Sequence, residues 1–140
     1  MENEIHINNI KFWLNQNVIY CDICNDFDKN YSLEDIEDLF YEAISILSNG
    51  TYLPVIFNFR ELNTLLSIKL FKLLSNSSRI EGVVLSKVFL VKKLKHKILL
   101  SFCQMFCGSN VSNIIFKDSN LAIEYSSQNY TVFNSLSCDG

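Results

Sequence analysis

The chain has 140 residues, of which 49% are apolar and 19% are charged, and its formal net charge is −3 at pH 7. This length fits one domain with a sizeable core, and a sequence pI of about 5.3 argues against a general nucleic-acid-binding protein. No apolar run approaches the ~20 residues of a membrane span, and the polar start does not resemble a secretory signal, so we expect a cytoplasmic protein.

Acidic and basic residues are unevenly divided along the chain. Residues 1–66 hold 11 Asp or Glu against 3 Lys or Arg, a net of −8, whereas residues 67–140 hold 4 against 9, a net of +5. The two halves either neutralise each other within the fold or offer two charged faces to partners. The sequence leaves both explanations open.

Two β-type runs, Ile10–Leu14 and Val18–Cys24, are separated by Asn15-Gln16-Asn17. Asn tolerates a positive φ angle, so this spacing predicts a hairpin. The side chains of the second run alternate between two faces, which places Tyr20 and Asp22 opposite the apolar residues.

A helix is predicted from an N-cap at Ser32 to a C′ residue at Gly50. Asp35 completes a sequence that resembles a capping box, and the acidic residues of the first turns match the helix dipole. We interpret them as a solvated face, with a partner surface as the alternative. The apolar stripe of this helix consists of Leu33, Ile36, Leu39, Phe40, Ala43, Ile44 and Leu47.

The segment Pro54–Leu74 is typical of a buried strand that feeds a helix through a polar loop. The same succession follows downstream, with strands at Val88–Val91 and Asn113–Phe116 and a helix at Leu94–Cys107 between them. The apolar residues of this last helix fall on one stripe: Leu94, Ile98, Phe102 and Met105.

After the last strand, Asp118 is predicted to cap a short helix that carries Leu121, Ala122 and Tyr125. Residues 129–140 form a predicted tail, with an edge strand at Thr131–Phe133 and a frayed end. The element order is therefore β-β-α-β-α-β-α-β-α over residues 1–128. It predicts a single α/β domain with a mixed, mostly parallel sheet of about five strands covered by helices.

The element order over roughly residues 5–128 resembles the STAS fold of anti-sigma factor antagonists, sulfate-transporter tails and small stand-alone bacterial proteins. In the antagonists a strand ends in Asp, and an Asp-Ser-Ser-Gly-Leu-Gly segment opens the next helix. Asn58 stands at the strand-end position, Ser67 at the phosphorylatable Ser and Leu70 at the Leu of the motif. The sequence departs from the motif at Leu66, Ile68 and Lys69, which stand in place of Asp, the second Ser and Gly. The resemblance implies a module that binds a protein partner and is switched by phosphorylation of Ser67.

Ser67 also has two explanations that are independent of any family. At the predicted start of a helix, free N–H groups and the dipole favour a phosphate, so Ser67 is a candidate switch. The same geometry favours a serine that simply caps the helix. The candidate partner-binding residues around it are Asn58, Arg60, Glu61, Asn63, Thr64 and Lys69.

A basic segment at the predicted start of the following helix is the second candidate site. Cations are disfavoured at a helix N-terminus, so this placement favours an anionic partner, with a solvated patch as the alternative. It should open at the same end of the sheet as the loop before Ser67. The candidate anion-binding residues are Lys92, Lys93, Lys95, His96 and Lys97.

The pairs Cys21/Cys24 and Cys103/Cys107 are interpreted as small core residues, with a zinc site as the alternative, and we expect no cofactor. No nucleophile, metal or phosphate-loop motif is present, so we expect no enzyme. The favoured function is a regulatory module for a protein partner. The alternatives are a carrier or sensor of a small anionic or lipid ligand, similar in outline to the CRAL-TRIO fold, and a homodimer joined through the hairpin.

Overall fold

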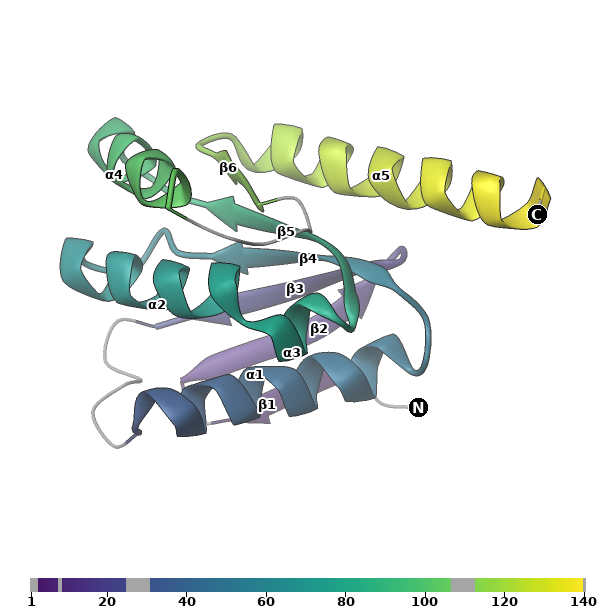
Figure 1. Cartoon of the computed structure of the whole chain (residues 1–140), viewed down its shortest axis with the longest axis horizontal. Helices are drawn as coiled ribbons and strands as arrows, with labels where there is room; N and C mark the ends of the chain where they lie inside the picture. The colour runs from purple at the N-terminus through teal and green to yellow at the C-terminus, as the bar shows by residue number, and fades with distance from the viewer. Residues whose placement is uncertain (1–2, 8, 25–30, 107–112, 140) are drawn as a thin grey trace.

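A six-stranded mixed sheet organises the computed structural model, which describes residues 3–7, 9–24, 31–106 and 113–139 (Figure 1). The strands are β1 (Glu4–Ile7), β2 (Ile10–Asn15), β3 (Val18–Ile23), β4 (Leu53–Asn58), β5 (Val84–Leu90) and β6 (Asn113–Phe116). The helices are α1 (Leu33–Ser48), α2 (Thr64–Asn76), α3 (Ser78–Glu81), α4 (Leu94–Gln104) and α5 (Ser119–Asp139). The strands lie in chain order. β1 to β3 pair antiparallel and β3 to β6 pair parallel, which confirms the predicted α/β class and mixed sheet.

The three crossover connections place their helices on one face of the sheet. Each parallel strand lies next to its predecessor, so right-handed crossovers bring α1, α2 and α4 to the same side. Figure 1 shows these helices side by side in that order. Their core is rich in aromatic rings. The ring of Phe89 on β5 lies 5.0 Å from Phe57 and 4.7 Å from Phe71, measured between ring centroids.

The opposite face of the sheet is covered by α5 over β4 and β5. Ala122 of α5 packs in a second core cluster with Val18, Ile56, Val88 and Leu90, all of them buried. β4 and β5 are therefore covered on both faces, which explains their continuous apolar sequences. β2 and β3 lie beside this helix, and Trp13 and Tyr20 on them stay half-buried. One strip of the sheet is thus left open next to α5.

The local signals at the hairpin and at both ends of α1 are confirmed. Gln16 and Asn17 have φ angles of 49° and 66°, as a two-residue hairpin of type I′ requires. Ser32 caps α1 by accepting a hydrogen bond of 3.1 Å from the backbone N–H of Asp35. Asn49 ends α1 in the left-handed conformation, and Gly50 follows with a φ of 86°.

Two predictions about the chain ends are wrong. β1 was not predicted, because a strand of four residues leaves too short an alternating pattern. The tail is helical to Asp139, where an edge strand was expected at Thr131–Phe133. Two contacts accompany the helical form: the Thr131 hydroxyl donates to the Ser127 carbonyl at 3.0 Å, and Phe133 packs edge-on against Tyr52. These contacts to other turns and elements outweigh the local β preference.

The described cysteines differ in burial, and the interpretation of Cys24 as a small core residue is wrong. Cys21 is buried, Cys24 is exposed and Cys103 is half-buried, while Cys107 lies outside the described residues. Within those limits no three His, Cys, Asp or Glu side chains gather as metal ligands. In the same part of the chain, no helix is long and apolar enough to cross a membrane.

Lys87 on β5 is fully buried, and it holds the C-terminal end of α2. Its ammonium group donates hydrogen bonds to the carbonyl oxygens of Leu74, at 3.3 Å, and Ser75, at 2.9 Å. The last carbonyls of a helix lack partners within the helix and carry its negative dipole end. A lysine in this strand therefore ties α2 to the sheet.

We expect Lys87→Met to destabilise the fold by about 1–3 kcal/mol, because it leaves buried carbonyl groups without their donor. Lys72→Met, at an exposed position of α2, is the matched control and should have little effect. Urea unfolding followed by circular dichroism measures both. Equal stability of Lys87→Met and wild type would contradict the assigned role.

Candidate functional site

The carboxyl ends of the parallel strands converge at one edge of the sheet. β4 ends at Asn58, whose backbone lies in register with Asp22 on β3 and with Leu90 on β5. Ligand sites of open α/β sheets lie at this edge. The loops after β4 and β5 both open here, as predicted.

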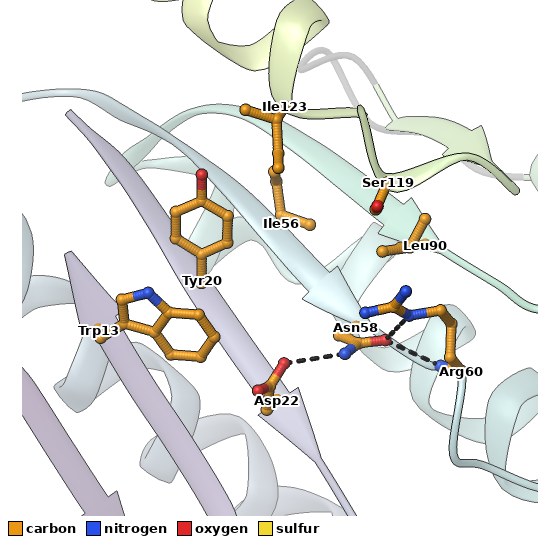
Figure 2. A pocket seen from close by; sticks show the side chains of 9 residues that line it. All are labelled: Trp13, Tyr20, Asp22, Ile56, Asn58, Arg60, Leu90, Ser119 and Ile123. Atoms are coloured by element: carbon orange, nitrogen blue, oxygen red, sulfur yellow. Dashed lines mark hydrogen bonds between the residues drawn. The ribbon is translucent and has the colours of Figure 1, made fainter. Parts of the chain in front are cut away.

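Asn58 organises this edge through its side-chain amide. Its Nδ2 donates a hydrogen bond of 2.9 Å to the Asp22 carboxylate (Figure 2). Its Oδ1 accepts from the backbone N–H of Arg60 at 3.1 Å and from Arg60 Nε at 3.0 Å. The guanidinium group is thereby oriented, and its two terminal nitrogens have no hydrogen-bond partner among the described residues.

A pocket of about 340 Å³, here the sheet pocket, lies on the open strip beside α5. Trp13 and Tyr20 form its aromatic side, with ring centroids 5.0 Å apart and ring planes 9° from parallel. Figure 2 shows the Asp22–Asn58–Arg60 hydrogen bonds at its other end. The lining residues are Trp13, Tyr20, Asp22, Ile56, Asn58, Arg60, Leu90, Ser119 and Ile123.

A second hollow, here the cationic hollow, adjoins the sheet pocket and shares Asn58 and Arg60 with it. It has a volume of about 370 Å³, and its other lining residues are Glu61, Lys92 and Lys117. Three cationic side chains thus face one carboxylate. Of the predicted site residues, the structure brings Asn58, Arg60, Glu61 and Lys92 together here.

The start of α2 differs from the prediction. Asn63 is the N-cap, and its side chain accepts a hydrogen bond of 2.8 Å from the backbone N–H of Leu66. Ser67 lies one turn further on and is 1% exposed, so the expectation that it caps the helix is wrong. Its hydroxyl is buried, which argues against phosphorylation of Ser67 in this fold.

Thr64 and His96 join the starts of α2 and α4 through a hydrogen bond of 2.9 Å between Oγ1 and Nε2. His96 is 6% exposed, which removes it from the candidate anion-binding surface. Burial lowers the pKa of His96, and the charges of Lys93 and Lys95 lower it further. Lys92 lines the cationic hollow, whereas Lys93, Lys95 and Lys97 do not.

The apolar stripe of α4 faces solvent. Apolar residues at helical spacing normally pack against the core, but here only His96 and Leu100 of α4 are buried. Two features accompany this orientation. β6 is a short edge strand, so α4 has little sheet to cover. The hydrogen bond between Thr64 and His96 turns the His96 side of α4 toward α2. With the turn that follows α4, the exposed stripe comprises Leu94, Ile98, Phe102, Met105 and Phe106.

Sequence reasoning missed three residues of the sheet pocket, Trp13, Tyr20 and Asp22, and Lys117 of the cationic hollow. One signal was available. Tyr20 and Asp22 were predicted on the face opposite the apolar residues of β3. What the sequence did not show is that α5 covers β4 and β5 but covers β3 only in part, so that Trp13 and Tyr20 stay half-buried.

No protein-family model, curated protein or solved structure matches the chain. The α/β class therefore stands on the strand order and pairing described above. The STAS resemblance stays a prediction.

The lowered pKa of His96 predicts a specific pH dependence of stability. Above the ordinary His pKa of about 6.5, His96 is neutral in both the folded and the unfolded chain. Below it, the unfolded chain binds the proton more readily than the fold does, so stability falls as the pH drops.

We expect His96→Asn to lose less stability than wild type between about pH 7.5 and pH 5.5, because one proton uptake on unfolding is removed. His6→Asn, at an exposed site, is the matched control. Urea unfolding at several pH values measures the slopes. A slope for His96→Asn equal to that of wild type would contradict the predicted shift.

Proposed function

We propose that this chain is a non-enzymatic, STAS-like regulatory module of the cytoplasm that binds a protein partner along α4 and the adjoining side of α2. The observation that carries this proposal is the exposed stripe of α4, whose five residues are between 57% and 77% exposed. Single exposed apolar residues are ordinary, but a continuous apolar surface marks an interaction site. The proposal thus moves the predicted partner surface from the loop after β4 to the neighbouring helices.

A groove between α2 and α4 extends this surface. A hollow of about 350 Å³ is lined by Lys72 and Asn76 from α2 and by Phe102, Cys103 and Phe106 at the end of α4. Phe102 and Phe106 pack edge to face, with ring centroids 5.7 Å apart. Two aromatic rings in a groove between helices are suited to receive apolar side chains from a partner helix.

The charges around the groove select the kind of partner. Lys72 lines the groove, Lys69 lies about one turn before it on α2, and Lys95 lies about two turns before Phe102 on α4. Acidic residues beside the apolar face of a partner helix would complement these lysines and speed its association. We therefore assign the groove to an amphipathic helix of another protein with an acidic border.

A comparative capture experiment tests this assignment. Wild type, Phe102→Asp and Ile46→Asp serve as baits for an extract of the source organism, and bound proteins are quantified by mass spectrometry. Ile46 is 63% exposed on α1, against 60% for Phe102, so it is a matched control on a helix that α2 separates from α4. We expect Phe102→Asp to reduce capture of the partner by about tenfold or more, because it places a charge at the centre of the apolar stripe.

A peptide with the sequence of an acidic, amphipathic helix of the captured protein is then synthesised. The proposal requires that this peptide bind the wild-type chain. The same set of proteins bound to wild type and Phe102→Asp would overturn the proposal. So would a wild-type dimer, measured by light scattering, that dissociates in Phe102→Asp, because the stripe would then be occupied by a second copy of the chain. Thermal unfolding checks that all three baits are folded.

A further inference from the structure

The sheet pocket and the cationic hollow meet at Asn58 and Arg60, and they differ in character. One is largely aromatic and aliphatic, and the other is bordered by cations. We propose that together they bind one small molecule that consists of a flat aromatic ring, a hydroxylated or N–H-bearing middle and an anionic group, the chemistry of a nucleoside monophosphate. The combined volume lies in the usual range for small-molecule sites.

The aromatic end of the site is formed by Trp13 and Tyr20, which hold each other in place. Their rings stack across neighbouring strands, and the ammonium group of Lys11 lies 4.8 Å from the Trp13 ring centroid. Each ring uses one face for this stack, and Lys11 lies over Trp13, so a base would stack on the face of Tyr20 that is turned away from Trp13. Any of the nucleic-acid bases can stack on an aromatic ring, because every base has a π face.

The anionic end of the site is formed by Arg60, Lys92 and Lys117. The Asn58 amide holds Arg60 through its Nε, and this leaves the terminal nitrogens for a ligand. Guanidinium groups bind phosphate or carboxylate oxygens in pairs, and two lysines add charge without a fixed geometry. One carboxylate, that of Glu61, lines the same hollow and leaves the cations in excess.

The spacing between the two ends fits a nucleotide. Tyr20 and Asp22 are two residues apart on β3, and Asn58 lies opposite Asp22, so the aromatic ring and the Asn58–Arg60 pair are separated by about 7 Å along the strands. This is the reach from a base across a ribose to its phosphate. A ligand lying along β3 and β4 would touch both ends at once.

The carboxylate of Asp22 favours a ligand that carries hydrogen-bond donors over an aliphatic ligand. Its carboxylate lines the sheet pocket and accepts a hydrogen bond from Asn58, so it can accept others from ribose hydroxyls or a base N–H. An acyl chain offers no donor, and it would strip water from the carboxylate without replacing it. The same negative charge keeps the phosphate away from the aromatic end and fixes the direction in which the ligand lies.

Trp13 is the single tryptophan of the chain, so its fluorescence reports on the sheet pocket. The experiment titrates the protein with AMP, with adenosine and with octanoate. We expect saturable quenching by AMP, and binding of adenosine at least about tenfold weaker because the Arg60 contact is absent. Arg60→Met should weaken AMP binding by a similar factor, while Lys95→Met, an exposed lysine outside the hollow, should not.

No saturable change with millimolar AMP, or equal affinity for AMP in wild type and Arg60→Met, would overturn the proposal. Saturable binding of octanoate that excludes AMP would overturn it in favour of an aliphatic anion. Phe102→Asp should keep the AMP response of wild type, so failure at this site and failure of the partner groove are distinguishable.

Discussion

The parallel pairing of β3, β4, β5 and β6 in chain order is the constraint on which the rest of the structure depends. Right-handed crossovers between such strands place every connecting helix on one face. Among the described residues α5 is the one helix that covers the other face, and one helix does not span six strands. The arrangement therefore buries β4 and β5 on both faces and leaves Trp13 and Tyr20, on β2 and β3, half-buried.

This one arrangement gives the molecule two separate candidate surfaces. The groove between α2 and α4 is lined by two aromatic rings, Cys103, Lys72 and Asn76, and it lies on the face of the crossover helices. The sheet pocket lies on the opposite face, beside the first turns of α5. The loops after β4 and β5 run from the sheet edge into α2 and α4, so they physically connect the two surfaces. Asn58 and the Thr64–His96 pair are the polar contacts along this connection.

The elements that local chemistry defines could be predicted from the sequence. The hairpin follows from Asn17, and the start of α1 follows from Ser32, because a turn or a cap depends on neighbouring residues alone. The rotation of α4 about its axis and the partial exposure of Trp13 could not be predicted. Both depend on how many strands the sheet has and on which of them a helix covers. Ser67 shows the same limit: its place in the helix start was missed by one turn, and that turn buries it.

The central claim is that the stripe of α4 faces solvent in the free protein. The most direct measurement is the NMR relaxation that a neutral, soluble gadolinium complex produces at the isoleucine methyl groups. Ile98 and Ile46 are 59% and 63% exposed, whereas Ile44 and Ile80 are fully buried. The account predicts strong, similar relaxation at Ile98 and Ile46 and little at Ile44 and Ile80. Protection of Ile98 to the level of Ile44 would contradict it, because the stripe would then already be covered.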